Sequence, residues 1–331
     1  MLAWLMLHAA LAAGATWAAR LYALSRRLLD APGERRSHRE ATPRGGGAGI
    51  VLAVLIAAIA LSVRFPAQAM LLRTFAAGFV LVAAVGWIDD HRPTSPWWRL
   101  AAHAVAAAVL ALGVALAHGD FRLALAAFVA AMVLTNVWNF MDGINGIAAS
   151  QAMLVAAAMA WATGGAWGWL AAALAAACAG FLPFNFPRAR IFMGDVGSGA
   201  VGFALAAVCV APVAHRALDG VLVLLPLSAF LTDASLTLLR RILRRERWWT
   251  PHAQHAYQAW ARRSGHTVVT LGYAAWTAAA LAPMVWLRTQ AWGLGIIVTA
   301  AWYTCAVSLW VYMQRRLAGG QAPQPSSRTR E

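Results

Sequence analysis

The stretch AMLLRTFAAGFVLVAAVGWIDDHRP, residues 69–93, decides the fold class. An apolar run over residues 69–88 ends in two adjacent carboxylates, Asp89 and Asp90. Roughly 20 apolar residues of helix cross a hydrocarbon core of about 30 Å. The stretch therefore predicts a transmembrane helix with two acids at one membrane surface.

The rest of the chain repeats this pattern. Further apolar runs lie near residues 2–22, 47–63, 99–117, 122–139, 147–163, 166–184, 198–214, 219–239, 268–287 and 291–313. The chain is 61% hydrophobic and 12% charged, whereas soluble domains carry about 25% charged residues. We therefore expect an all-α, polytopic integral membrane protein with about eleven transmembrane helices.

The basic residues indicate the orientation of these helices. The net charge of +15 comes from arginine alone, because the chain contains no lysine. Most arginines fall in loops on one side of the predicted bundle, and the positive-inside rule makes that side cytoplasmic. This predicts an N-terminus outside, a retained first helix, and a cytoplasmic C-terminus. Because the arginines flank apolar runs, we interpret them as topology signals and expect no nucleic-acid partner. Residues 1–316 form one predicted membrane domain, followed by a disordered tail over 317–331.

Four acids stand where apolar runs begin or end, on the predicted cytoplasmic side: Asp89, Asp90, Asp142 and Asp195. Two adjacent carboxylates repel each other, so a cation or a shared proton is expected beside Asp89 and Asp90. Mg²⁺ prefers few carboxylates together with water and substrate phosphates. The pattern indicates a divalent-metal and phosphate site at the membrane surface. The alternative for the aspartate pair is a solvated loop start.

Two glycine-containing turns hold the other acids. Asn139, Asp142 and Asn145 are spaced three apart in NFMDGING, residues 139–146, and would align in a helical turn. The alternative is a capped helix junction. In RIFMGDVGSG, residues 190–199, Asp195 and Ser198 begin a helix, whose free amides attract anions. The alternative there is an N-cap, and both interpretations are compatible.

Three further features are candidates of weaker specificity. His252 and His255 lie in an arginine-rich loop, where they bind phosphate, relay a proton or simply face solvent. Asp233 lies inside an apolar run, so it is either functional or a hydrogen-bonding partner between helices. The first loop is basic and glycine-rich and offers donors to a pyrophosphate, although its arginines also serve as topology signals. Its residues are Arg35, His38, Arg39, Thr42, Pro43, Arg44 and Gly45–Gly47.

Taken together, these segments resemble the polyprenyl-phosphate N-acetylhexosamine-1-phosphate transferase family. The resemblance runs from about residue 30 to residue 258 in family order. It rests on ERRSHREATPRGGG (34–47), GWIDDHRPTSPWWRL (86–100), NFMDGINGIA (139–148), RIFMGDVGSGAVGF (190–203) and PHAQHAYQ (251–258). Five such segments in order are specific.

The resemblance implies that polyprenyl (undecaprenyl) phosphate attacks a UDP-N-acetyl sugar, releasing UMP and starting a lipid-linked surface glycan. It implies Mg²⁺, with Mn²⁺ as the alternative, held by Asp195. By the same resemblance Asp89 and Asp90 handle the lipid phosphate, with Asp89 as the candidate base. His252 and His255 meet phosphates. The implied substrate-binding residues are Arg44, Asn139, Asp142, Asn145, Asn185 and Phe192.

The resemblance also implies a bacterial inner membrane location with the site facing the cytoplasm, and it leaves a homodimer open. The chain departs from the family pattern at Ala253, where relatives commonly carry arginine, and at Asn145, where some carry aspartate. The competing interpretation is a polytopic transporter. Transporters place binding groups near the bilayer midplane, whereas these motifs cluster at one face.

Overall fold

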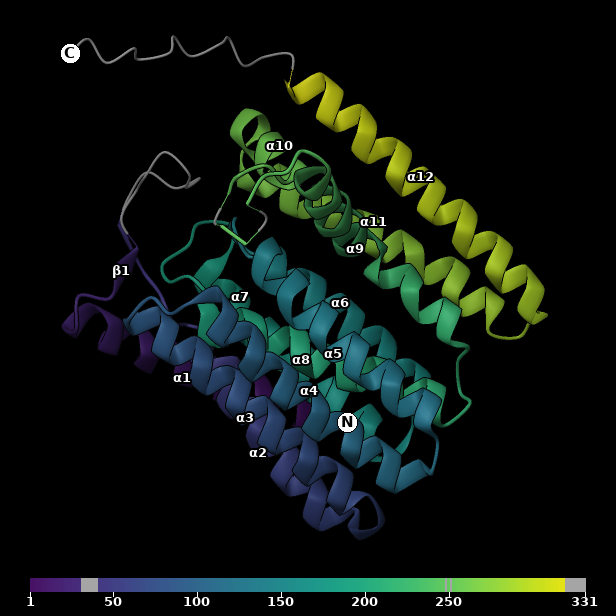
Figure 1. Cartoon of the computed structure of the whole chain (residues 1–331). Coiled ribbons are helices and arrows are strands. Elements are labelled where there is room, and N and C mark those ends of the chain that lie inside the picture. The colour runs from purple at the N-terminus through teal and green to yellow at the C-terminus, as the bar shows by residue number, and fades with distance from the viewer. Residues whose placement is uncertain (31–40, 248, 251, 319–331) are drawn as a thin grey trace, which may run out of the picture.

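The computed structural model describes residues 1–30, 41–247, 249–250 and 252–318. Within these residues the chain is a bundle of helices, shown in Figure 1. The long helices are α1 (Leu2–Ser25), α2 (Ala48–Arg64), α3 (Ala69–His91), α4 (Pro96–His118), α5 (Phe121–Met141), α6 (Ile147–Ala162), α7 (Gly165–Asn185), α8 (Asp195–Ala214), α9 (Gly220–Leu243), α11 (His266–Leu287) and α12 (Trp292–Ala318). Each predicted apolar run corresponds to one of them.

The predicted all-α, multi-pass fold is confirmed. Within the described ranges, nine helices are long and apolar enough to cross a membrane, and α2 and α6 are apolar but shorter. The predicted tail falls almost entirely on residues 319–331, which lie outside the described residues, while α12 itself extends to Ala318.

Helix α8 lies at the centre of the bundle, and almost all of its residues are therefore buried. Small residues let the neighbouring helices approach it closely, as is usual in membrane bundles. A Cβ on Gly202 would meet the Leu134 carbonyl oxygen of α5 at 2.3 Å, and one on Gly86 of α3 would meet the Asp195 carbonyl oxygen at 2.2 Å. Helices α3 and α5 therefore pack directly against α8.

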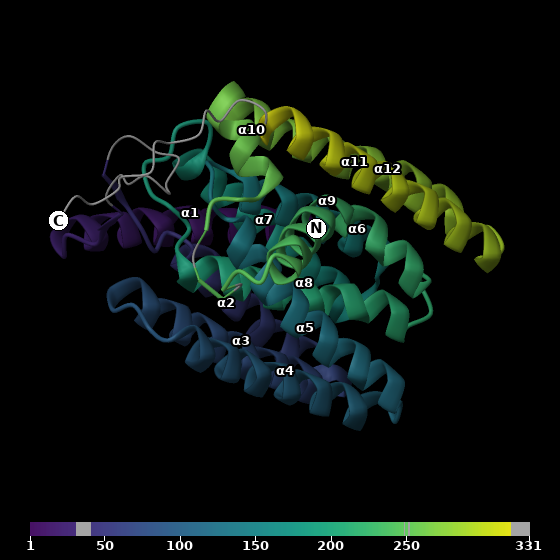
Figure 2. The same ribbon diagram turned by 45° about the horizontal axis from the view of Figure 1, so that its top comes forward.

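The remaining helices surround this core. Figures 1 and 2 show α3 and α4 on one side of the bundle and α11 and α12 on the opposite side. Helix α12 packs on α9, α10 and α11 and stands away from the core around α8. The predominantly exposed face of α12 carries apolar side chains such as Ile297 and Leu309, as expected of a surface that meets lipid.

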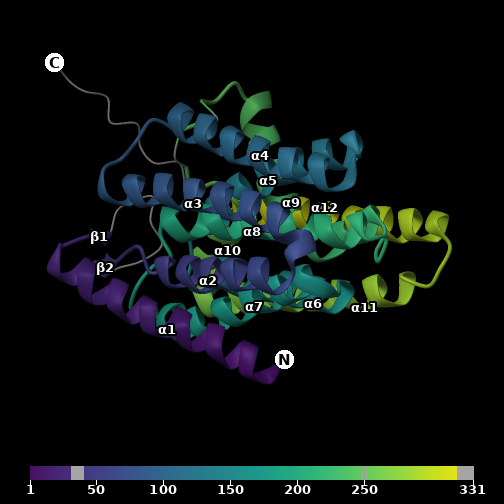
Figure 3. The same ribbon diagram turned by 90° about the horizontal axis from the view of Figure 1, so that it is seen from below.

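Four short elements were absent from the predicted pattern. A 3₁₀ turn, Pro66–Gln68, precedes α3. Strands β1 (Leu29–Asp30) and β2 (Thr42–Pro43) pair antiparallel, with Leu29 opposite Pro43, and lie beside the C-terminal end of α1 in Figure 3. Helix α10 (Ala256–Ser264) follows the histidine pair directly. Such short segments leave no hydrophobic period in a sequence.

Candidate active site

The acid pair at the end of α3 reaches the start of α8 through Asp90. The Oδ1 and Oδ2 atoms of Asp90 accept hydrogen bonds from the backbone amides of Asp195 and Val196, both at 3.1 Å. The Asp90 side chain is buried, and the Arg44 Nε atom lies 3.9 Å from its Oδ1. Arg44 also donates to the Asp90 carbonyl oxygen. The amides that we expected to attract a substrate anion at this helix start are thus occupied by Asp90.

Glycine is required where these two segments meet. Gly194 has a φ of +75°, and a Cβ there would lie 2.6 Å from Asp90 Oδ2. Only glycine combines that backbone conformation with so close an approach. The glycine of the FMGD segment therefore serves the contact between α3 and α8.

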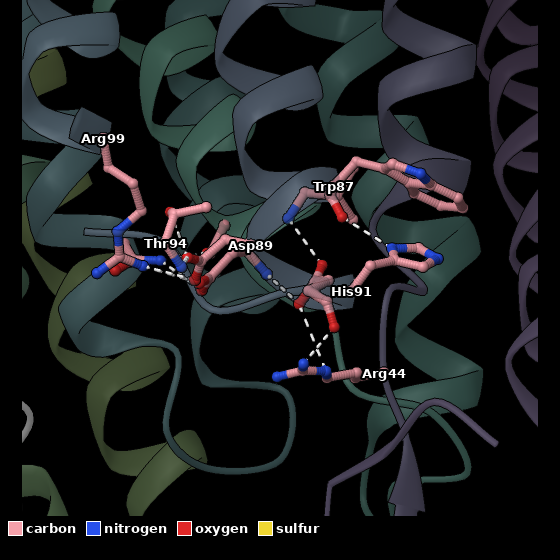
Figure 4. A network of polar contacts seen from close by, with 11 residues as sticks. Arg44, Trp87, Asp89, His91, Thr94 and Arg99 are labelled. Carbon is pink, nitrogen blue, oxygen red and sulfur yellow. Dashed lines mark hydrogen bonds and ion pairs between the residues drawn. The ribbon is translucent and has the colours of Figure 1, made fainter. Parts of the chain in front are cut away.

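Asp89 and Asp195 share one cation, the guanidinium of Arg99 in the first turn of α4. The Arg99 Nη1 atom donates to Asp89 Oδ2 at 2.9 Å and to Asp195 Oδ2 at 3.0 Å. Thr94 fixes the other oxygen of Asp89, since its amide and hydroxyl donate to Oδ1 at 2.7 and 2.6 Å. Figure 4 shows Thr94 and Arg99 directed at Asp89, while Arg44, which pairs with Asp90, lies on another side of the network.

Asn139 of α5 completes this contact. Its Nδ2 atom donates to Asp195 Oδ1 at 2.8 Å and to Ser198 Oγ at 3.1 Å. Acids and amides from α3, α5 and α8, separated by up to 106 positions, therefore meet at one end of the bundle. The predicted gathering of Asp89, Asp90 and Asp195 is present in the structure.

A cavity of about 350 Å³ opens beside this cluster. Its walls come from α3, α4, α5, α8 and the histidine loop. The polar and charged side chains in the lining include Arg99, His103, Asn136, Asn139, Asp142, Asp195, Thr250, His252, His255, Tyr257 and Gln258. Of the predicted site residues, Asn139, Asp142, Asp195, His252 and His255 thus line a single space.

Asp142 and His252, both in the cavity wall, have altered acidity. Burial raises the pKa of Asp142 to about 7, and the negative charge of Asp90 adds to this effect. Burial lowers the pKa of His252 to about 4, and the nearby His255 and Arg241 act in the same direction. At neutral pH, His252 is therefore an uncharged ring stacked on His255, with 4.9 Å between the ring centroids.

Four of the expected substrate-binding residues are not in the cavity wall: Arg44, which binds Asp90 instead, and Asn145, Asn185 and Phe192. The Asn185 side chain is buried and bridges two loops, because its Oδ1 accepts from the Gly146 amide at 2.7 Å and its Nδ2 donates to the Ile191 carbonyl at 2.9 Å. Asn145 Nδ2 donates to the Pro187 carbonyl at 3.1 Å. The Phe192 amide donates to the Pro43 carbonyl at 2.8 Å. These residues connect the loops that support the cavity.

The glycine run of the first loop pairs with the same segment. The amides of Gly46 and Gly47 donate to the carbonyls of Phe192 and Met193 at 2.9 and 2.8 Å. Both amides are therefore engaged with protein, in contrast to the expected pyrophosphate contact. The other expected donors of this loop, Arg35, His38 and Arg39, lie outside the described residues.

The donor set around Asp89 and Asp195 fits a divalent cation. Among the described residues, no group of three or more His, Cys, Asp and Glu side chains is arranged as a metal cage. However, two carboxylates already converge on one cationic nitrogen, that of Arg99. Mg²⁺ is held by one or two carboxylates and completes its shell with phosphates and water. The chemistry of the site therefore suits Mg²⁺ in the presence of phosphate ligands.

Arg99 and Thr94 were not singled out in the sequence. Arg99 stands ten positions after Asp89, in the segment that carries the aspartate pair, and looked like one more topology signal. A proline at position 96 starts α4 and turns the chain back, which brings Arg99 over the acids. The sequence signal for the role of Arg99 was its position as a basic residue at the start of the helix that follows the aspartate pair.

An all-helical membrane bundle with an acidic and amide-rich cavity at one end defines a multi-pass membrane protein with a polar site at the membrane surface. Residues 72–213 match the model of the family described as glycosyl transferase family 4. The chain is 34% identical over 208 residues to decaprenyl-phosphate N-acetylglucosaminephosphotransferase of Mycolicibacterium smegmatis, covering 53% of this chain and 51% of the relative.

Two other relatives agree. The Mycobacterium leprae protein with the same name is 30% identical over 272 residues, 68% of each chain. Phospho-N-acetylmuramoyl-pentapeptide-transferase of Trichormus variabilis is 33% identical over 195 residues, 50% of this chain and 52% of the relative. The chain belongs to glycosyl transferase family 4, as its motifs predicted. It spans between about half and two thirds of the length of these curated relatives.

Proposed function

We propose that the protein transfers N-acetylhexosamine 1-phosphate from a UDP-sugar to polyprenyl phosphate and releases UMP. The observation that carries this proposal is the sharing of Arg99 by Asp89 and Asp195, because Arg99 and Asp195 line a cavity that His252 and His255 also line. The names of the relatives support a polyprenyl-phosphate acceptor and a phosphosugar donor.

The proposed reaction joins two polyanions. An oxygen of the lipid phosphate forms a bond to the β-phosphorus of the UDP-sugar, and the bond from that phosphorus to the bridging oxygen of UMP breaks. Catalysis of phosphoryl transfer depends mainly on charge neutralisation and in-line positioning. In this proposal Arg99 supplies a protein cation, and Asp195 with Asp89 would hold Mg²⁺. Bound there, the ion would neutralise phosphate charge.

The remaining residues act by position. Asp89, fixed by Thr94, is the proposed proton acceptor for the lipid phosphate. Asp90 holds the first turn of α8 in place, which supports a positioning role for it. Asn139 orients Asp195, and His255 offers a ring nitrogen to a phosphate in the cavity. We propose that Asp142, Asn145 and Phe192 border the nucleotide and that Asn185 holds their loops together.

The site position favours this enzyme over the transporter alternative. The acids close to the cavity lie in the last turn of α3, at the end of α5 and in the first turn of α8, all at one end of the bundle. A transporter site is expected near the middle of its helices. We further propose that this end faces the cytoplasm of a bacterial inner membrane, where UDP-sugars are available.

The test is UMP release by the purified protein in detergent with Mg²⁺, undecaprenyl phosphate and a panel of UDP-N-acetyl sugars. UDP-N-acetylglucosamine comes first, because two relatives are named for that sugar. We expect UMP to appear only when lipid phosphate, nucleotide sugar and divalent cation are all present. Absence of UMP with every sugar, in the presence of lipid, would refute the proposal.

A further inference from the structure

Asp233 is a carboxylate in the interior of α9, and five donors surround it. Its Oδ1 accepts from the Ala256 amide at 2.9 Å, Trp310 Nε1 at 3.1 Å and Thr237 Oγ1 at 3.2 Å. Its Oδ2 accepts from the Tyr273 hydroxyl at 2.8 Å and the Tyr257 amide at 3.0 Å. The side chain is only 2% exposed. Such density of donors indicates a carboxylate held in one fixed position.

Two of these contacts fix the backbone that carries His255. Ala256 and Tyr257 are the first residues of α10, so their amides have no partner within the helix. Asp233 supplies that partner from another helix, and it thereby determines where α10 begins. His255 directly precedes these two residues, so its main chain is held by the same carboxylate.

The ring of His255 also lies against Asp233. The distance between His255 Nδ1 and Asp233 Oδ1 is 3.6 Å, which is ion-pair range and longer than a good hydrogen bond. Among the described residues, Nδ1 has no hydrogen-bond partner. The rings of His252 and Tyr257 stack on the His255 ring at centroid distances of 4.9 and 5.6 Å, with interplanar angles of 29° and 28°. Since Nδ1 is next to the carboxylate, Nε2 is the ring nitrogen that remains for a ligand in the cavity.

We propose that Asp233 is a positioning residue for the reaction: it fixes the orientation and tautomer of His255, so that Nε2 serves the phosphates in the cavity. A neighbouring carboxylate determines which ring nitrogen of a histidine carries the proton. Asp233 itself lies behind the cavity and is not among its lining residues. Asp233, the acid inside an apolar run, therefore acts on the reaction through the histidine loop.

A purely structural role for Asp233 predicts a different effect of its substitution on activity. Tyr273 of α11 and Trp310 of α12 also bind Asp233, so loss of the carboxylate loosens the packing of both helices. That loss would reduce activity whether or not position 255 carries histidine. A role through His255 makes the two substitutions non-additive.

The test is a double-substitution cycle of Asp233→Asn and His255→Ala, and it rests on the proposed function. We expect Asp233→Asn to lower kcat on the order of 10- to 100-fold, as loss of a partner that orients a functional histidine does, with KM for the UDP-sugar changed less than about threefold. In the His255→Ala background, the same substitution should lower kcat less than about twofold. Asp219→Asn is the matched control and should keep wild-type kcat, because Asp219 is an exposed carboxylate at the opposite end of α9 that makes no side-chain cap hydrogen bond.

A second readout does not depend on activity. Solid-state NMR of protein with isotope-labelled histidine identifies the His255 ring as the signals lost in His255→Ala. We expect a protonated Nδ1 in the wild type and displaced ring signals in Asp233→Asn, or in Asp233→Glu if the asparagine variant does not accumulate. Unchanged ring signals, or losses of kcat that multiply in the double variant, overturn the inference. An inactive wild type with the expected ring signals would instead count against the proposed function alone.

Discussion

Asp90 Oδ1 accepts a hydrogen bond from the backbone amide of Asp195 at 3.1 Å, so the acid that ends α3 holds the first turn of α8. This contact explains why the two acids are so close although 105 positions separate them. It also distinguishes the members of the adjacent pair. Asp90 binds protein backbone, whereas Asp89 binds Arg99, which lines the cavity.

Replacement of Asp90 by alanine should therefore lower both stability and activity. The amides of Asp195 and Val196 would lose their partner in a buried place, which costs about 1–3 kcal/mol for each unsatisfied group. We expect a clear fall in the thermal unfolding temperature in detergent, together with loss of UMP release. Wild-type unfolding temperature in Asp90→Ala would contradict this role.

Asp89→Asn and Asp195→Asn should behave differently from Asp90→Ala. Each keeps the shape of its side chain but removes a negative charge from the pair around Arg99. We expect each to lower kcat at least about 100-fold, comparable to removal of a key electrostatic group, with normal membrane expression. Asp120→Asn is the control, since Asp120 caps α5 at the end remote from Asp142. Turnover retained in both site variants would mean that the site is misplaced.

The fold was predictable because apolar runs in this chain are long and each became one helix. The site was predictable at the level of which residues gather, because Asp89, Asp142 and Asp195 stand at run ends on the same side. Their individual partners were not predictable. Whether Asp90 binds a ligand or the amides of α8 depends on packing between α3 and α8, and sequence patterns carry no such distance.

The same limit applies to the loops. Asn185 and the glycines at 46 and 47 looked like ligand-binding groups, because asparagine amides and glycine-rich turns commonly contact phosphates and bases. In the structure they bind backbone groups of neighbouring loops. A polar residue in a loop serves a ligand or another loop equally well, and only the three-dimensional partner distinguishes the two.

Asn185→Ala should consequently act on loop position. The substitution removes the partners of the Gly146 amide and the Ile191 carbonyl, both bound by this side chain. We expect a fall in the unfolding temperature and a rise of severalfold in KM for the UDP-sugar. The measurement is a kinetic series in UDP-sugar at saturating lipid. An unchanged KM would indicate that the loops hold their position without Asn185.

His255→Ala should weaken turnover without abolishing it, because charge neutralisation by Arg99, and by Mg²⁺ where it binds as proposed, would persist. A positioned acid, base or phosphate contact typically contributes 10²–10⁴-fold, and we expect the lower end, about 100-fold. His215→Ala is the matched control, since His215 follows α8 at the end opposite Asp195. Full activity in His255→Ala would mean that this residue has no role in the reaction, which is the alternative that the loop sequence also allowed.

The last prediction concerns the pH dependence of stability at Asp142. Burial raises the pKa of its carboxyl to about 7 in the folded protein, above the value of about 3.9 for an unfolded chain. Between these values the folded state binds the proton and the unfolded state does not, so this group stabilises the fold at low pH. Its contribution is lost as pH rises toward 7, and above that value it no longer changes.

His252, with a pKa lowered to about 4, changes stability with pH in the opposite direction over part of this range, and both effects are present in the wild type. The comparison is therefore between wild type and Asp142→Asn, in which the His252 contribution is shared. We expect the unfolding temperature of the wild type, relative to the variant, to fall between pH 5 and about 7 and then to level off. A constant difference over that range would mean that the Asp142 carboxyl already ionises freely in the cavity wall.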